Sequence, residues 1–202
     1  MALRQKARNV LRAFVQRFGP EYAKRCLWNF EFSSGQWNCL DRMGDERGHV
    51  QIEKHANHGH ILDLGCGSGT TSVELNPAVY RSYTGIDISD VAVHKAKARA
   101  HEAGRSGHNE YYQANIATYV PRRQHDLILF GDSLYYLHHI DSVLKRYSEY
   151  LSQDGVFLVR IHGVSGKLRH IFNMIENQYR VVETELRIID GTTVGIIVFR
   201  PL

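Results

Sequence analysis

The hydrophobic and polar positions divide the chain into an N-terminal part with helical spacing and a longer part in which strands and helices alternate. Apolar residues recur at helical spacing over residues 1–18, and Gly19-Pro20 ends that predicted helix. Residues 21–37 are rich in aromatic side chains and contain a Ser-Ser-Gly break, which predicts a short helix followed by a loop. The apolar spacing of Glu46–His58 predicts a third helix.

From His60 onward, short apolar runs alternate with amphipathic segments. The runs predict strands at Ile61–Leu64, Tyr83–Ile88, Tyr111–Gln113, Asp126–Phe130, Val156–Ile161, Arg180–Ile189 and Thr193–Phe199. The segments between them predict a helix that starts near Gly69 and helices at Asp90–Gly104, His139–Leu151 and Lys167–Asn177.

Strands and helices that alternate with short connections predict an α/β fold, with a doubly wound sheet and helices on both faces. Asp190-Gly191 joins the last two apolar runs, and this dipeptide is among the strongest hairpin signals. We therefore expect a seven-stranded, mostly parallel sheet whose last strand is antiparallel. No repeat or interdomain linker is visible, so we expect an N-terminal helical arm or lid over residues 1–50 and one α/β domain over residues 51–202.

Composition narrows the class of protein further. Of the 202 residues, 43% are hydrophobic and 23% are charged, which excludes wholesale disorder. The net charge of +4 is mild and does not indicate a nucleic-acid partner. The apolar runs are far too short for a membrane span. Three cysteines without a CxxC pattern exclude a disulfide scaffold and favour a reducing compartment, so we expect a cytoplasmic protein.

The first 18 residues contain five basic residues and no acidic one, and this pattern is open to three interpretations. An Arg-rich, acid-poor amphipathic segment is typical of a transit peptide, and also of a helix that lies on a membrane surface. The third interpretation is a cap helix that packs its apolar face on the domain. The cap helix is favoured because the segment has no Ser and continues without a linker into the rest of the chain.

A glycine-rich loop directly follows the first predicted strand, with the sequence Asp63-Leu-Gly-Cys-Gly-Ser-Gly-Thr70. Glycines let the backbone turn sharply and let a ligand approach the main chain, and the next helix offers free N–H groups to an anionic group. Asp87 ends the next strand, 18 residues after Gly69, where a carboxylate can accept hydrogen bonds from ribose hydroxyls. Thr70 stands where a dinucleotide fingerprint has glycine, which disfavours a nicotinamide-dependent oxidoreductase.

The segment Leu62–Gly69 resembles the first motif of class I S-adenosylmethionine-dependent methyltransferases, and Gly85–Ser89 resembles their second motif. The resemblance covers roughly residues 61–202, including the closing hairpin, which dinucleotide-binding Rossmann folds lack. It implies that the chain is a methyltransferase enzyme with S-adenosyl-L-methionine as its cofactor.

The resemblance also implies a set of cofactor-binding residues. In the family, the loop glycines leave room for the methionine part, Asp63 would reach the amino group through water, and Asp87 would hold the ribose hydroxyls. Ile88 would lie against the adenine. Asn115 stands at a place where the family often has an acid, and its carbonyl can accept a hydrogen bond. The complete implied set is Asp63, Gly65, Cys66, Gly67, Gly69, Asp87, Ile88, Asn115, Ile116 and Gly131, with Cys66 interpreted as a packing residue of the loop.

Residues 131–139 follow the fourth strand, and in the family this segment faces both the sulfonium of the cofactor and the acceptor. The segment has no proline, which argues against enzymes that methylate the amino groups of nucleic-acid bases. The chain also lacks the glutamate pair of protein arginine methyltransferases. We therefore expect the small-molecule branch, with methyl transfer to an N or O atom. The alternatives are an RNA or protein methyltransferase that docks through the basic N-terminal helix, and a non-catalytic subunit that binds S-adenosylmethionine.

Three residues are candidates for a general base, namely His138, His139 and Asp132, because an oxygen or ammonium nucleophile must lose a proton. The alternative for the two histidines is that they only begin the next helix. The histidine-rich stretch His55–His60 matches no standard zinc spacing, so no metal site is expected.

Five residues are candidates for acceptor binding. Tyr135 and Tyr136 are expected to be walls of the pocket, because an unperturbed tyrosine is not a base at neutral pH. Arg160 would pair with a carboxylate or phosphate of the acceptor, or form a surface ion pair. Trp28 and Trp37 would belong to a lid that excludes water, or would attach the N-terminal arm to the sheet edge.

Overall fold

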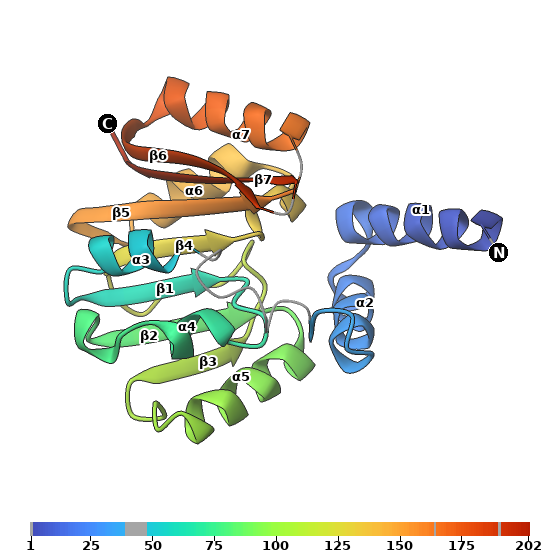
Figure 1. Cartoon of the computed structure of the whole chain (residues 1–202), viewed down its shortest axis with the longest axis horizontal. Coiled ribbons are helices and arrows are strands. Elements are labelled where there is room, and N and C mark those ends of the chain that lie inside the picture. The colour runs from blue at the N-terminus through green and yellow to red at the C-terminus, as the bar shows by residue number, and fades with distance from the viewer. Residues whose placement is uncertain (1, 39–47, 164, 190) are drawn as a thin grey trace.

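The computed structural model describes residues 2–38, 48–163, 165–189 and 191–202. Seven strands form one sheet in the order β3-β2-β1-β4-β5-β7-β6 (Figure 1). Strands β1 to β5 pair in parallel, whereas β7 is antiparallel to both β5 and β6. The strands are β1 His60–Leu64, β2 Ser82–Asp87, β3 Asn109–Gln113, β4 His125–Gly131, β5 Leu151–His162, β6 Arg180–Ile189 and β7 Thr192–Arg200. The expected mostly parallel sheet with an antiparallel last strand is confirmed.

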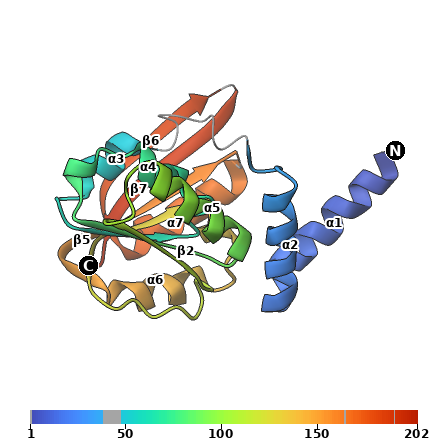
Figure 2. The same cartoon turned by 90° about the horizontal axis from the view of Figure 1, so that it is seen from below.

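Helices lie on both faces of the sheet (Figure 2). Their bounds are α1 Ala2–Phe18, α2 Glu21–Ser33, α3 His49–His55, α4 Thr70–Glu74, α5 Asp90–Glu102, α6 Ile140–Ser148 and α7 Ser165–Gln178, with short 3-10 turns at η3 Pro77–Val79 and η4 Leu134–Tyr136. Helix α5 starts as the sequence predicts, because the hydroxyl of Ser89 accepts a hydrogen bond from the Ala92 amide at 3.1 Å.

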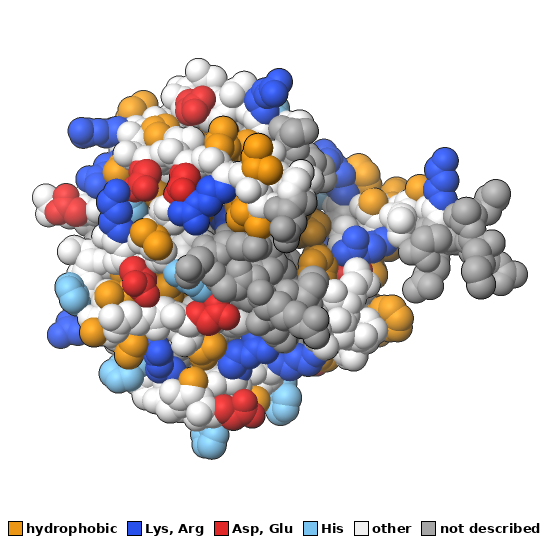
Figure 3. All heavy atoms as spheres, in the orientation of Figure 1, with side chains coloured by type: hydrophobic (Ala, Val, Ile, Leu, Met, Phe, Trp, Pro, Cys, Tyr) orange, Lys and Arg blue, Asp and Glu red, His pale blue; other side chains and the backbone are white. Residues whose placement is uncertain are grey.

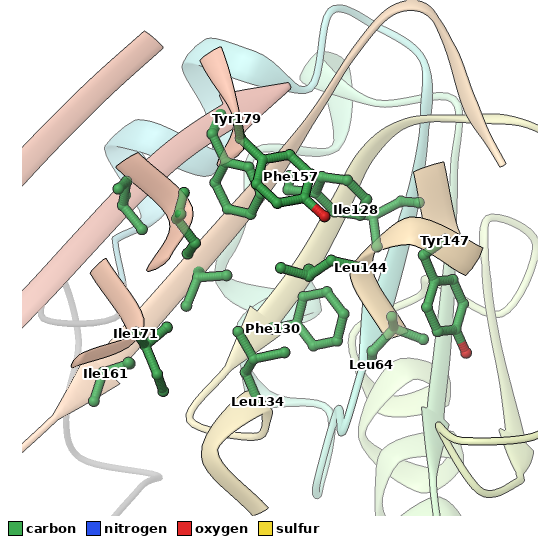
Figure 4. Close-up of a cluster of buried hydrophobic side chains, with 14 of the residues drawn as sticks. Leu64, Ile128, Phe130, Leu134, Leu144, Tyr147, Phe157, Ile161, Ile171 and Tyr179 are labelled. Atoms are coloured by element: carbon green, nitrogen blue, oxygen red, sulfur yellow. The ribbon is translucent and has the colours of Figure 1, made fainter. Parts of the chain in front are cut away.

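Two hydrophobic cores hold these layers together. One lies between the sheet and helices α6 and α7, where the Phe130 and Tyr147 rings meet edge to face at 6.2 Å (Figure 4). The other lies between the opposite face and helices α3 and α5, and includes Ile52, Ala96 and Tyr83. Because each large side chain buried in this way contributes about 1.5–3 kcal/mol, the two cores fix the positions of the loops at the sheet edge.

The start of β5 differs from the expectation. The apolar spacing predicted a helix through Leu151, but α6 ends at Ser148 and Leu151 pairs with His125 of β4. The register then shifts, so that Val156 faces Leu127. Leu151 is buried in the sheet core, and its apolar character therefore fits a strand as well as a helix.

The third predicted helix, Glu46–His58, is shorter in the structure. Helix α3 covers His49–His55, and its predicted first two positions lie outside the described residues. Asn57 and His58 have φ values of 51° and 53°, so the backbone leaves the helical conformation there before β1 begins. The predicted hairpin residue Asp190 also lies outside the described residues, although Ile189 and Thr192 pair as the flanks of a tight turn.

Helix α2 of the N-terminal arm is attached to the sheet domain through α5. The side-chain amide nitrogen of Asn29 donates to the Asp90 carboxylate at 2.6 Å, and the Ser89 hydroxyl donates to the side-chain oxygen of Asn29 at 2.7 Å. The Lys95 ammonium donates to the Phe32 carbonyl at 2.6 Å. These bonds place α2 over the carboxyl end of the parallel strands.

Helix α1 extends from α2 away from the sheet (Figures 1 and 2). Its apolar residues Val10, Leu11, Phe14 and Phe18 are exposed, so the expectation of a cap helix with its apolar face on the domain is wrong. The reason is that a polar edge of the helix, at Arg12, makes the contact with α2 instead. No helix in the described part of the chain is long and apolar enough to cross a membrane.

Candidate active site

A cavity of about 640 Å³ opens at the carboxyl end of the parallel strands, beneath the N-terminal arm. The loops after β1, β2, β3, β4 and β5 all contribute to its walls, which is where α/β sheets bind ligands. Fifteen of the eighteen predicted site residues line it: Gly65, Gly67, Asp87, Ile88, Asn115, Ile116, Gly131, Asp132, His138, His139, Trp28, Trp37, Tyr135, Tyr136 and Arg160. The fold therefore brings residues from the arm and from five loops into one pocket.

The glycine loop requires its glycines for packing and for access. Gly65 has a φ of 91°, and a Cβ there would lie 2.6 Å from the Cβ of Ser133. Gly69 has a φ of 75°, and a Cβ there would lie 2.7 Å from the Cβ of Ala96 in helix α5. Gly67 differs, because a Cβ would meet only the Phe32 ring, at 3.5 Å. Gly67 therefore presents its backbone to the cavity, where a ligand can approach the main chain.

Asp87 ends β2 with its carboxylate facing this loop. One of its oxygens accepts from the Ser89 amide at 2.8 Å, and the other accepts from the Gly67 amide at 3.0 Å. The side chain lines the cavity although the residue is only 8% exposed. Burial raises the pKa of Asp87 to about 6, and the backbone hydrogen bonds oppose that rise. The carboxylate is thus fixed at the cavity wall.

Asp63, Cys66 and Gly69 do not line the cavity. Asp63 is buried beneath the loop, where it accepts a hydrogen bond from the Tyr83 hydroxyl. Burial raises the pKa of Asp63 to about 7, although the Tyr83 bond and the positive charge of Arg160 lower it. Burial also raises the pKa of the Cys66 thiol, as expected for a packing residue. Contacts of these three residues with a cofactor remain predictions.

Asn115 follows β3 and connects this part of the site to the arm. Its carbonyl oxygen accepts from the Ala117 amide at 2.9 Å, and its amide nitrogen donates to Glu21 of α2 at 2.7 Å. The carbonyl keeps a second lone pair, so its predicted role toward an adenine amino group stays a prediction. Ile116 lines the same wall.

Part of the cavity wall is aromatic. The Trp28 ring centre lies 5.1 Å from that of Tyr136, edge to face, and 5.6 Å from that of Trp37 in a tilted arrangement. The ring centres of Tyr135 and Tyr136 are 4.5 Å apart. These rings both line the cavity and join the arm to the loop after β4, so the two interpretations of the tryptophans are compatible. Burial raises the pKa of both tyrosines, which therefore keep their protons at neutral pH and serve as walls.

Asp132 and Arg160 form an ion pair in the cavity wall, in which Arg160 is buried and Asp132 is half-buried. Asp132 has a φ of 57°, and its carboxylate accepts from Arg160 at 2.5 Å and from the His162 amide at 2.7 Å. Arg160 is only 8% exposed, so the alternative of a surface ion pair is excluded. Its buried Nε has no hydrogen-bond partner among the described residues. A buried donor of this kind favours a ligand that carries an acceptor.

The two histidines lie exposed at the mouth of the cavity. Nε2 of His138 contacts the Arg17 carbonyl oxygen, and its ring lies 5.5 Å from the Phe18 ring of α1. Partial desolvation lowers the pKa of His138 although its side chain is exposed, and the nearby positive charges of Lys24 and Arg17 lower it further. His139 precedes α6 as its N-cap residue.

Ten further residues line the cavity. They come from the arm, from the loops after β3 and β4, from the first turns of α6 and from the end of β5: Gln16, Lys24, Phe32, Ala117, Ser133, Leu137, Ser142, Val143, Arg146 and His162. The predicted start of a helix after β4 was the signal for the α6 residues, because that helix begins at the ligand-binding edge. No local pattern indicates Gln16, since α1 reaches the cavity only through the tertiary fold.

The histidine-rich stretch before β1 serves structural contacts. His55 pairs with Glu183 of β6 at 3.0 Å, and His60 shares a hydrogen bond of 2.7 Å with Ser82. Within the described ranges, no three His, Cys, Asp or Glu side chains gather in a way that could hold a metal ion.

Comparison with known proteins supports the family. Residues 62–157 match the family described as methyltransferase domain. A protein of Geobacillus sp. (strain WCH70) that is named a methyltransferase is 34% identical over 130 residues, or 60% of this chain and 50% of that protein. The chain thus spans about half the length of this relative.

Solved structures share the fold. The N-methyltransferase NodS from Bradyrhizobium japonicum WM9, in complex with S-adenosyl-L-homocysteine, has a TM-score of 0.65 at 18% identity over 79% of this chain and 90% of that chain. The 1,6-didemethyltoxoflavin-N1-methyltransferase from Burkholderia thailandensis has a TM-score of 0.72 at 14% identity over 88% of this chain and 86% of that chain. Residues 62–157 thus match a methyltransferase domain, and the fold and the glycine loop are similar to those of class I S-adenosylmethionine-dependent methyltransferases.

Proposed function

We propose that the protein transfers a methyl group from S-adenosylmethionine to a nitrogen or oxygen atom of a small molecule. The observation that carries this proposal is that one cavity is lined by the glycine loop and Asp87 and also by aromatic side chains such as Trp28 and Tyr136. The ion pair of Arg160 with Asp132 lines the same cavity. We infer that a cofactor and an acceptor bind next to each other in this cavity, as an in-line transfer requires.

The described residues fit the cofactor. Gly67 leaves its backbone open toward the cavity, Asp87 offers a fixed carboxylate for ribose hydroxyls, and Ile88 offers an apolar wall for a base. S-adenosylmethionine supplies an electrophilic methyl group on a sulfonium, which is a good leaving group. The protein therefore contributes mainly by orienting the two ligands and by excluding water, and orientation supplies up to about 7–11 kcal/mol in favourable cases.

The aromatic part of the cavity wall and Arg160 favour an acceptor that is flat and partly aromatic and that carries an anionic or carbonyl oxygen. Trp28, Trp37 and Tyr136 offer ring surfaces, and the free Nε of Arg160 offers a buried donor. The Burkholderia relative was solved with 1,6-didemethyltoxoflavin bound, which supports an acceptor of this general kind. We further propose that residues 1–50 form the arm that covers this part of the cavity, and that residues 51–202 form the methyltransferase domain.

Proton removal falls to the histidines at the cavity mouth. His138 and His139 both line this opening, where an imidazole can accept a proton from the acceptor. Asp132 is assigned a different role, because both of its oxygens already accept hydrogen bonds from Arg160 and His162. We assign Asp132 to the positioning of Arg160.

A thermal-shift titration with S-adenosylhomocysteine, beside NAD(H) and NADP(H), tests the cofactor. A ligand at 100 times its Kd stabilises the folded protein by about 2.7 kcal/mol, so a rise in Tm with S-adenosylhomocysteine alone is expected. A rise with the nicotinamide cofactors alone would contradict the proposal. Transfer of a labelled methyl group to a panel of flat carboxylate, phenol and heterocyclic acceptors then tests the reaction.

The basic residues of α1 keep an RNA or protein acceptor as the second candidate. The same labelled assay with RNA and with protein extracts discriminates between the candidates. Incorporation into macromolecules at low salt, with none into the small-molecule panel, would favour the second candidate. Binding of S-adenosylhomocysteine without transfer to any acceptor would favour a non-catalytic subunit.

A further inference from the structure

We propose that helix α1 docks the protein onto the surface of an anionic phospholipid membrane. The helix lies on the bilayer, with its apolar stripe in the headgroup region and its basic residues against lipid phosphates, and does not span it. This inference concerns the outer face of the arm and does not rest on the proposed function.

The apolar stripe is continuous and faces solvent. Val10, Leu11, Phe14 and Phe18 are spaced so that they share one side of the helix, and they are 65%, 63%, 59% and 62% exposed. The Phe14 and Phe18 rings pack on each other at 5.4 Å. Single exposed apolar residues are common on protein surfaces, but four on one helix face mark an interaction site.

The opposite edge of the helix holds it to the protein. Arg12 donates to Glu31 of α2 at 2.5 and 3.0 Å, and Glu31 is almost fully buried. Trp37 donates to the same carboxylate at 3.1 Å, and Gln16 lines the cavity. The polar edge therefore faces the domain and the apolar stripe faces outward, which is the reverse of the arrangement in a cap helix.

The positive charge of the helix favours an anionic partner. Residues 1–18 contain five basic residues and no acidic one. Lys6 and Arg17 are exposed, and the Arg17 guanidinium lies 5.7 Å from the centre of the Phe18 ring. Figure 3 shows basic and hydrophobic side chains next to one another along the projecting arm. A second copy of this helix would bring like charges together, whereas anionic headgroups neutralise them while the apolar stripe enters the interface.

Co-sedimentation of the full chain with large vesicles tests the proposal. We expect binding to vesicles that contain phosphatidylglycerol, at least tenfold weaker binding to pure phosphatidylcholine, and weaker binding at high salt. The double variant Leu11→Ser/Phe14→Ser should bind anionic vesicles at least tenfold more weakly than the wild type. The matched control Leu186→Ser/Ile188→Ser removes two exposed apolar side chains from β6 and should bind like the wild type.

Several results would overturn the inference. They are wild-type protein that stays in the supernatant, equal binding to neutral and anionic vesicles, and loss of binding in the β6 control as well. Light scattering tests whether a second copy of the chain covers the apolar stripe instead. If the wild type forms a dimer but does not bind vesicles, and Leu11→Ser/Phe14→Ser is a monomer, the stripe is a contact between two copies. Circular dichroism and the Tm of each variant show that the fold is intact, independently of any cofactor.

Discussion

Arg160 of β5 donates to Asp132, which directly follows β4, through an ion pair of 2.5 Å at the carboxyl edge of the sheet. Asp132 holds a positive φ and also receives the His162 amide, so its carboxylate is fixed on both sides. The pair places a buried cationic side chain in the wall of the cavity, which aromatic side chains such as Tyr135 and Tyr136 also line. This arrangement favours recognition of an acceptor oxygen by Arg160 over proton removal by Asp132.

The first prediction separates the role of Arg160 from cofactor binding. Arg160→Lys keeps a positive charge but loses the fork of donors, so we expect KM for the acceptor to rise about tenfold or more with S-adenosylhomocysteine affinity unchanged. Asp132→Asn keeps an acceptor for the His162 amide but loses the ion pair, and should raise KM in the same direction. A loss of kcat with an unchanged KM in Asp132→Asn would instead indicate a general base.

The second prediction concerns the glycine loop. Gly65→Ala places a Cβ 2.6 Å from Ser133 in a backbone with a φ of 91°, so we expect the free energy of unfolding to fall by about 2–4 kcal/mol. Gly104→Ala is the matched control, because Gly104 has a φ of 67° with no atom within 4 Å of the added carbon. The control should lose only about 1 kcal/mol, from the backbone alone. Equal losses in urea denaturation would show that the loop is not tightly packed.

The third prediction is a dependence of stability on pH. Burial raises the pKa of Asp63 to about 7, whereas in the unfolded chain this group ionises near pH 4. Between these values the folded protein binds more protons than the unfolded chain, so the free energy of unfolding falls as pH rises. The side chain in Asp63→Asn cannot ionise. We therefore expect the Tm of this variant minus the Tm of the wild type to be larger at pH 8 than at pH 4.5. A constant difference in Tm across this range would contradict the assignment.

The fourth prediction concerns the attachment of α1. Glu31→Gln removes the charge that Arg12 pairs with. Because Arg12 is about one-third exposed and solvent screens the pair, we expect the free energy that holds α1 against α2 to fall by about 1–2 kcal/mol. Because the contact holds only the arm, tryptic cleavage after Arg12 and Arg17 should become several times faster, with the Tm of the domain nearly unchanged. Glu149→Gln, on the far side of the fold from the arm, serves as a control for the loss of one acidic charge.

Much of the fold could be predicted because the spacing of apolar residues and the breaks between segments indicate the same elements along the chain. The alternation of apolar strands with amphipathic helices after His60, and the closing hairpin, indicated the sheet that the structure contains. Boundaries were less certain where one apolar residue fits two elements, as Leu151 shows. Its pairing with His125 depends on a register shift that no local pattern encodes.

The site was predictable where a motif fixes the backbone, as at Gly67 and Asp87, and less so where tertiary contacts decide. Asp63 belongs to the same motif but points beneath the loop toward Tyr83, since the two are buried side by side. The orientation of α1 was mispredicted because periodicity shows that a helix is amphipathic but not which side faces the domain. The pairing of Arg12 with Glu31, which sets that orientation, lies between two separate helices.

The most direct measurement is a tryptophan-fluorescence titration with S-adenosylhomocysteine. The chain has two tryptophans, Trp28 and Trp37, and both line the cavity, so a ligand there must alter the signal. We predict saturable binding to the wild type and at least tenfold weaker binding to Asp87→Asn. The control Asp154→Asn, at an exposed position of β5, should bind like the wild type. Absence of binding, or equal affinity in all three proteins, would contradict a cofactor site between the glycine loop and Asp87.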